Sequence, residues 1–202
     1  MNIARFLRVA AIVAALALLG ACTGVRVRAD QPMLDAQAAR ETALVQQTTW
    51  SISGKLGVSD GRDGGSGQVE WSERGDGGDF VLRAPVTGRS FELHVDGSQS
   101  VLLGLDQGPL HGGDAAALLR EALGWEVPLD ELRAWVRGMR APGLPATLLF
   151  DAQGLPVELT QAGWTVQYRD WFTDRVPPLP RKVYAERAPY RVRLSIQHWD
   201  MP

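Results

Sequence analysis

Trp50-Ser-Ile-Ser-Gly-Lys-Leu-Gly-Val58 decides the fold class, because large apolar side chains alternate in it with small or polar ones. Trp50, Ile52, Leu56 and Val58 alternate with polar or small residues. Successive side chains of a β-strand point to opposite faces, so this period of two predicts a strand with one buried face and one wet face. Strands of this kind are typical of antiparallel sheets.

Nine further segments carry the same signal, between stretches rich in Gly, Asp or Pro. The clearest runs from Tyr190 to Trp199. The others cover residues 67–71, 80–82, 91–95, 101–105, 147–150, 156–160, 164–168 and 182–185. About ten or eleven strands in one domain are more than a flat sheet holds without curling. The sequence therefore predicts a mainly β fold, either a curved antiparallel sheet or an unclosed β-barrel, of about 10–11 strands with a few helices.

The connections between these strands include turns and three helices. Residues 60–66 and 74–79 are predicted turns, and the glycine-rich part of the first is a hairpin loop, since no Gly-Lys-Ser/Thr follows it. One helix is expected from Asp30 to about Gln47, with Pro32 near its start. Residues 114–123 and 128–137 predict two short helices that bury their apolar sides on the concave face of the sheet.

The N-terminus has the layout of a secretory signal: Arg5 and Arg8 precede an uncharged run from Val9 to Leu19. Eleven apolar residues are too few to cross a bilayer, which takes about 20. The run ends in Leu18-Leu19-Gly20-Ala21-Cys22, which resembles the lipobox of bacterial lipoproteins. We expect a signal peptide at 1–21, a lipid on Cys22, a flexible tether over 22–31 and one domain over 32–202. Thr23 stands where an Asp would signal inner-membrane retention, which favours the outer membrane.

Composition excludes several function classes. The chain has a formal net charge of −2, which becomes −4 without the two signal arginines, so nucleic acid is not an expected partner. One cysteine cannot form a disulfide framework, and histidines at 94, 111 and 198 do not have the spacing of metal ligands. His111-Gly-Gly-Asp114 is faintly similar to a lipase oxyanion segment, but the chain has no Gly-x-Ser-x-Gly nucleophile elbow. We expect no enzyme activity, no metal and no cofactor beyond the covalent lipid.

An ordered set of motifs resembles the LolA/LolB family of lipoprotein localisation proteins, and in particular its outer-membrane receptors. The resemblance spans nearly the whole mature chain. It rests on the lipobox cysteine, Trp50-x-Ile-x-Gly-Lys-Leu-Gly, Gly67-x-Val-x-Trp71, Phe80 to Leu82 followed by Ala84-Pro-Val-Thr-Gly88, Phe91-Glu-Leu93, Leu119 to Trp125, and Val127-Pro-Leu-x-x-Leu-x-x-Trp135-x-x-Gly138.

The resemblance implies both a fold and a function. The family fold is an unclosed antiparallel barrel with helices as a lid over a hydrophobic cavity. Its outer-membrane receptors accept acylated lipoproteins from the periplasmic carrier LolA and insert them into the inner leaflet, without nucleotide hydrolysis. The expected partners are therefore LolA, lipoprotein cargo and outer-membrane phospholipid, with the receptor itself a monomer. The segment matching the family's delivery loop is Pro85, Val86, Thr87 and Gly88, with Val86 as the apolar tip.

Thirteen apolar residues are candidates for the acyl-chain cavity, although each could equally be ordinary core. They are Ile52, Leu56, Trp71, Phe80, Leu82, Phe91, Leu93, Leu118, Leu119, Leu132, Trp135, Leu148 and Trp164. Trp125 and Trp199 lie near element ends, as core plugs or interfacial anchors. The alternative function is a lipoprotein scaffold that binds a protein partner in envelope assembly. A tightly packed interior favours the scaffold, and several hundred cubic ångströms of empty apolar space favour the carrier.

Overall fold

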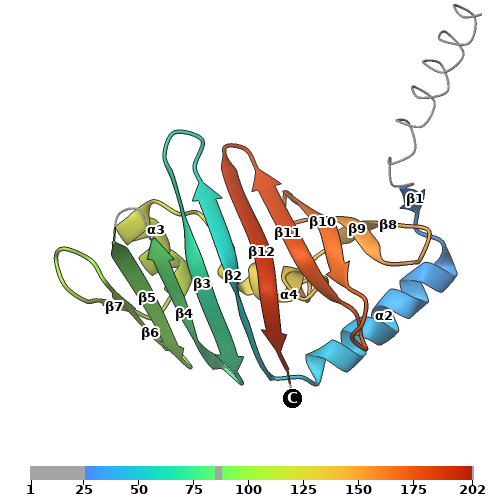
Figure 1. The fold of residues 1–202 in the computed structure, drawn as a ribbon, viewed down its shortest axis with the longest axis horizontal. Coiled ribbons are helices and arrows are strands. Elements are labelled where there is room, and N and C mark those ends of the chain that lie inside the picture. Colours follow the sequence, from blue (N-terminus) through green and yellow to red (C-terminus); the bar gives the residue numbers. More distant parts are fainter. Residues whose placement is uncertain (1–25, 85–87, 202) are drawn as a thin grey trace, which may run out of the picture.

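A single antiparallel sheet of twelve strands, described by a computed structural model over residues 26–84 and 88–201, forms the body of the molecule (Figure 1). The strand order is β1-β8-β9-β10-β11-β12-β2-β3-β4-β5-β6-β7. Among the described strands, β1 and β7 stand at the two ends of that order and do not pair with each other, so the barrel is not closed. The strands are β1 Val27–Arg28, β2 Thr49–Ser59, β3 Gly64–Arg74, β4 Gly77–Ala84, β5 Arg89–Asp96, β6 Gln99–Leu103, β7 Leu110–Gly112, β8 Ala146–Phe150, β9 Pro156–Gln161, β10 Trp164–Phe172, β11 Leu179–Arg187 and β12 Tyr190–Asp200.

Burial along β2 alternates in the same way as the apolar residues in its sequence. Ile52, Leu56 and Val58 are at most 8% exposed, whereas Lys55 between them is exposed. β2 pairs with β3 on one side and with β12 on the other. Gly54 fits the second contact, since a Cβ there would lie 2.2 Å from the carbonyl oxygen of Ser195. The centre of the sheet therefore joins an early strand to the last strand of the chain.

The three helices of the described residues begin and end where local chemistry allows. Helix α2 (Gln31–Val45) has Asp30 as N-cap, whose side chain accepts a hydrogen bond from the Met33 amide at 2.9 Å. Helix α3 (Ala115–Leu123) has Asp114 as N-cap and ends at Gly124 in the left-handed conformation. Helix α4 (Leu129–Trp135) is shorter than the predicted 128–137. Within the described residues, no helix has both the length and the apolar character needed to cross a membrane.

All ten predicted strands are present. The structure differs from the prediction in two ways: some strands extend into glycine-rich segments, and two short edge strands are added. The predicted turn at 60–66 shrinks to 60–63, because Gly64 to Gly67 pair with β2. The turn at 74–79 reduces to Gly75 and Asp76. Glycine can pair through its backbone but adds no side chain to the alternating pattern, so these strand ends could not be recognised in the sequence. Strands β1 and β7 were not predicted, because two or three residues show no period.

Strand β1 lies inside the segment that was expected to be a flexible tether. Val27 and Arg28 pair with Phe150 and Leu149 of β8, and the Arg26 guanidinium lies 3.0 Å from the Glu158 carboxylate. The expected tether over 22–31 is thus attached to the sheet edge from Arg26 onward.

Candidate functional site

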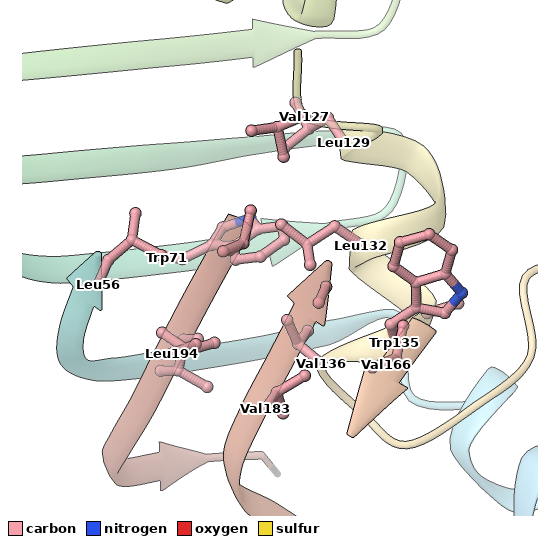
Figure 2. Close-up of a cluster of buried hydrophobic side chains, with 14 of the residues drawn as sticks. Leu56, Trp71, Val127, Leu129, Leu132, Trp135, Val136, Val166, Val183 and Leu194 are labelled. Atoms are coloured by element: carbon pink, nitrogen blue, oxygen red, sulfur yellow. The ribbon is translucent and has the colours of Figure 1, made fainter. Parts of the chain in front are cut away.

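A pocket with a wholly apolar wall lies between the sheet and the two helices α3 and α4. Its floor comes from β2, β3, β4, β11 and β12, and its cover from α3, α4 and the segment between them. The side chains that line it, hereafter the apolar pocket, are Leu56, Val58, Val69, Trp71, Phe80, Leu119, Trp125, Val127, Leu129, Leu132, Val183, Ala185, Val192 and Leu194. Figure 2 shows part of this wall, with Leu132 of α4 directed toward Trp71 on the sheet.

The helices nearly fill the apolar pocket in this state. The empty space within it, with its open mouth included, is about 560 Å³. The cavity that remains between the side chains is only about 30 Å³, which is room for about two waters. An acyl chain needs much more, so binding one requires the helices to move away from the sheet.

The single polar atom on the large Trp71 ring is satisfied outside the apolar pocket. Its Nε1 donates to the Glu73 carboxylate at 2.7 Å, and Glu73 is only 7% exposed. The Arg133 guanidinium on α4 donates to the same carboxylate oxygen at 2.8 Å. A buried carboxylate needs such partners, and here they also fasten α4 to β3.

A second polar anchor holds the end of α4. Trp135, fully buried, donates from Nε1 to the Gln161 side-chain oxygen at 2.9 Å. Gln161 is 2% exposed and also binds the amide and carbonyl of Ala141 and the carbonyl of Leu144. The chain that leaves α4 is therefore held against β9 by a fully satisfied side chain.

Arg40 of α2 clamps the same region from the other side. It donates to the carbonyls of Gly138 at 2.7 Å, Arg137 at 2.6 Å and Pro178 at 2.9 Å. Gly138 has φ +72°, and a Cβ there would lie 2.6 Å from the Trp171 ring, so the close approach requires glycine. Burial lowers the pKa of Arg40 to about 10, which leaves it charged at neutral pH. The positive charge of Arg40 therefore holds three backbone carbonyl groups in place.

The α3 side of the cover has few such ties. Beyond the N-cap, its contacts are apolar: Leu118 and Leu119 are 4% exposed, and Trp125 meets Phe91 edge-on with ring centres 6.5 Å apart. One ion pair crosses from this segment to the sheet, Glu126 to Arg187 at 3.3 Å, with both side chains more than 40% exposed. Exposed pairs of this kind contribute about 0–1 kcal/mol.

Five of the thirteen candidate cavity residues line the apolar pocket: Leu56, Trp71, Phe80, Leu119 and Leu132. The remaining eight lie outside its wall. Phe91 is half-buried against Trp125, and the others pack in the core: Ile52, Leu82, Leu93, Leu118, Trp135, Leu148 and Trp164. Trp199 is also core, and its Nε1 donates to the Pro180 carbonyl.

Several lining residues were missed from the sequence. Val192 and Leu194 stood in a recognised strand, and Val183 and Ala185 in another, but period alone does not say which strands adjoin. The pairing of β12 with β2 brings them to the pocket. Trp125 lines the apolar pocket instead of plugging the core.

The remaining predicted sites are only partly visible. Cys22, Pro85, Val86 and Thr87 lie outside the described residues. Gly88 has φ +68° and donates its amide to the Ala84 carbonyl at 2.9 Å. This hydrogen bond links the end of β4 to the residue before β5.

The histidines are dispersed. His94 Nδ1 lies 2.7 Å from the Asp79 carboxylate, and this hydrogen bond lowers the pKa of Asp79. His111 and His198 are exposed on β7 and β12. In the described ranges, no three His, Cys, Asp or Glu side chains gather in a way that could hold a metal ion.

Comparison with known proteins places these features in a family. The family model described as outer membrane lipoprotein LolB matches residues 48–199. The outer-membrane lipoprotein LolB of Xylella fastidiosa (strain 9a5c) is 38% identical over 208 residues, covering 98% of this chain and 95% of the relative. That of Xanthomonas campestris pv. campestris (strain B100) is 36% identical over 187 residues, covering 90% and 86%.

The fold has a solved counterpart. The crystal structure of a LolA superfamily protein from Nitrosomonas europaea matches with a TM-score of 0.54 at 10% identity, covering 84% of this chain and 93% of that one. The predicted fold, an unclosed antiparallel sheet with lid helices, is thereby confirmed.

Proposed function

Because this chain belongs to the LolB family of outer-membrane lipoproteins, we propose that it receives acylated lipoproteins in the apolar pocket and passes them to the outer membrane. The family is one of lipoprotein localisation and not of enzymes. The observation that carries the proposal is the pocket itself, fourteen apolar side chains with no polar lining residue. Such a surface gives acyl chains a place outside water and asks no polar group to lose its hydrogen bonds.

Energetics require a sheltered route of this kind. A triacylated N-terminus carries on the order of 45 methylenes, and each contributes about 0.8 kcal/mol when buried, so exposure to water would cost tens of kcal/mol. We propose that the chains leave the cavity of the carrier LolA, enter the apolar pocket and continue into the bilayer. Each step must offer better apolar burial than the last, which makes nucleotide hydrolysis unnecessary.

The anchor and the loop have separate roles in this proposal. A lipid on Cys22 would hold the monomeric protein at the inner leaflet, where its work is needed. The segment Pro85 to Gly88 would touch phospholipid with Val86 and release the cargo there. Neither role requires these residues to catalyse a reaction.

The scaffold function remains the second candidate, and the small free space in the pocket favours it. A carrier is expected to offer several hundred cubic ångströms, whereas this state leaves room for about two waters. The two functions differ in whether the pocket opens. If it opens, fluorescent acyl probes will bind and Leu132→Asp will abolish binding.

A transfer assay tests the proposal directly. Protein lacking residues 1–21 and carrying Cys22→Ala should take a radiolabelled lipoprotein from LolA at micromolar concentration. Leu132→Asp should prevent the transfer by placing a charge in the pocket wall. No transfer to the unsubstituted pocket would overturn the carrier role.

Delivery is tested separately from acceptance. Val86→Glu should still accept cargo but fail to place it in liposomes, because a carboxylate resists entry into the bilayer. Val176→Glu is the matched control, since Val176 is 100% exposed on the turn between β10 and β11. Equal delivery by both variants would remove the role given to the loop.

A further inference from the structure

Basic side chains gather on the outer face of the sheet, away from the apolar pocket. They project from four adjacent strands, β10, β11, β12 and β2. The five residues, hereafter the outer basic face, are Lys55, Arg169, Lys182, Arg191 and Arg193. Their concentration is notable in a chain whose net charge is −2.

Strand register places these cations side by side. Arg193 lies opposite Gly57, Arg191 opposite Ser59, and Lys55 opposite Ser195. Arg191 and Arg193 are two residues apart on one strand, so their side chains share a face with Cα atoms about 7 Å apart. Lys182 also faces Ser195, from the other neighbour of β12.

Three carboxylates near these cations pair with arginines that are not part of the outer basic face. Glu70 pairs with Arg83 at 2.7 Å, and Asp170 with Arg181 at 3.6 Å. Glu158 pairs with Arg26 at 3.0 Å, and Glu186 lies opposite Arg191 but pairs with Arg193 only at the limit of 4.0 Å. Across residues 26–84 and 88–201, no carboxylate lies within 4.0 Å of Lys55, Arg169, Lys182 or Arg191. Arg169 hydrogen-bonds to the neutral Gln167 side chain and stacks on Tyr184, so these four positive charges have neutral partners or none in the described residues.

A groove beside Arg191 and Arg193 gives this face a shape that suits small anionic groups. Gly57, Gly64, Gly65 and Ser66 form its floor, and its empty space, with the open side included, is about 720 Å³. A Cβ built on Gly65 would meet nothing within 4 Å. The two guanidiniums thus stand over a low surface where a phosphate group can reach both of them.

We propose that the outer basic face binds an anionic phospholipid surface, with headgroup phosphates in the groove at Arg191 and Arg193. Charge complementarity favours a membrane over a protein partner. Within residues 26–84 and 88–201, Tyr184 is the one aromatic ring on which these cations stack, whereas the centres of protein interfaces are usually richer in aromatic anchors. This surface orients the protein on the bilayer and goes beyond the carrier role, since it needs neither cargo nor the pocket.

The test uses cargo-free protein lacking residues 1–21 and carrying Cys22→Ala, sedimented with vesicles. Vesicles of equal phosphatidylcholine and phosphatidylglycerol should bind it, and pure phosphatidylcholine should not. Arg191→Gln should lower binding about five-fold, and Arg191→Gln with Arg193→Gln about 25-fold, from ~1 kcal/mol per basic residue near an anionic surface. Raised salt should weaken binding in parallel.

Arg120→Gln is the matched control, because it removes the same charge from an exposed site on α3. The inference is overturned if Arg120→Gln lowers binding equally, which would make it a net-charge effect. It is also overturned if neutral and anionic vesicles bind alike, if inorganic phosphate alone competes fully, or if the Arg191 variant binds anionic vesicles as well as the unsubstituted protein does. Because no cargo is present, failure of the transfer assay would leave this result intact.

Discussion

Helices α3 and α4 cover the same pocket but are held in place by different kinds of contact. Helix α4 and the residues after it are fixed by directional bonds: Arg133 to Glu73, Trp135 to Gln161, and Arg40 to the Gly138 carbonyl. Helix α3 and the segment to Val127 rest mainly on apolar contacts, with one exposed ion pair at Glu126. Hydrogen bonds therefore hold α4 to the rest of the domain, whereas α3 is held to the sheet mainly by apolar packing.

The difference teaches which part can open. Apolar contacts have no required geometry and can be re-formed with an acyl chain in place of a side chain. Breaking a buried hydrogen bond leaves both partners unsatisfied, which costs about 1–3 kcal/mol for each group. We therefore expect the α3 side to lift and α4 to stay as the fixed wall.

The largest expected effect is from Trp135→Ala. It removes the largest fully buried side chain of α4 and leaves the Gln161 amide short of a partner. Equilibrium unfolding in urea should show that the free energy of unfolding falls by about 3–5 kcal/mol. Leu119→Ala on α3 should lose about 2 kcal/mol, the low end for a leucine, because free space already adjoins it.

Hydrogen exchange gives the same comparison without a substitution. Amides of α3 should exchange through local opening, well before global unfolding, whereas amides of α4 should exchange nearly at the global rate. Equal protection of the two helices would contradict the division into a fastened and a movable part.

Arg40→Leu should have the next largest effect. The substitution deprives three carbonyl oxygens of a charged donor, and hydrogen bonds to charged groups are worth about 1.5–3 kcal/mol. We expect the free energy of unfolding, measured in urea, to fall by about 2–3 kcal/mol. Amide hydrogens of residues 136–141 should also exchange faster. Arg120→Leu on exposed α3 should change stability by less than about 0.5 kcal/mol. Similar losses for both variants would mean that Arg40 is not a clamp.

The smallest effect is a pH dependence at Glu41, which binds Arg140 after the end of α4. Burial disfavours the ionised carboxylate, but hydrogen bonds from Arg140 and Gln37 outweigh it, so the pKa of Glu41 is lowered. A lowered pKa means that the unfolded chain binds the proton more readily. The stabilisation is therefore present above the unfolded pKa of about 4.3 and is lost as pH falls through the folded value.

Glu41→Gln isolates this contribution. The difference in unfolding free energy between the native chain and Glu41→Gln should be largest near neutral pH and should shrink in acid. Equilibrium unfolding at several pH values measures it. A difference that grows below pH 4 would show that the sign is wrong.

Much of the fold could be predicted because its strands alternate. Trp50 to Val58 and Tyr190 to Trp199 each carry a period of two, and each is a strand with one buried face. The edge strand at Leu110–Gly112 could not be predicted, since three residues have no period. The glycines at 64 and 65 suggested a loop, yet they pair with β2 through backbone atoms.

The site was harder to predict than the fold. Leu119 and Trp71 were named as cavity residues and do line the pocket, but Trp135 and Trp164 carry the same apolar signal and pack together in the core, with ring centres 6.1 Å apart. Hydropathy says that a side chain is buried and not what it is buried against. The clamp at Arg40 was missed, because its partners are carbonyls about 100 residues away, which carry no side-chain signature.

The pairing of β2 with β12 has a consequence for the order of folding. Strand β2 ends at Ser59 and gains its second neighbour only from Tyr190 to Asp200. Contacts of such long sequence separation form slowly, because a long loop must close before any of them is made. A chain emerging from a membrane pore N-terminus first would therefore stay without its central seam until the last strand had followed.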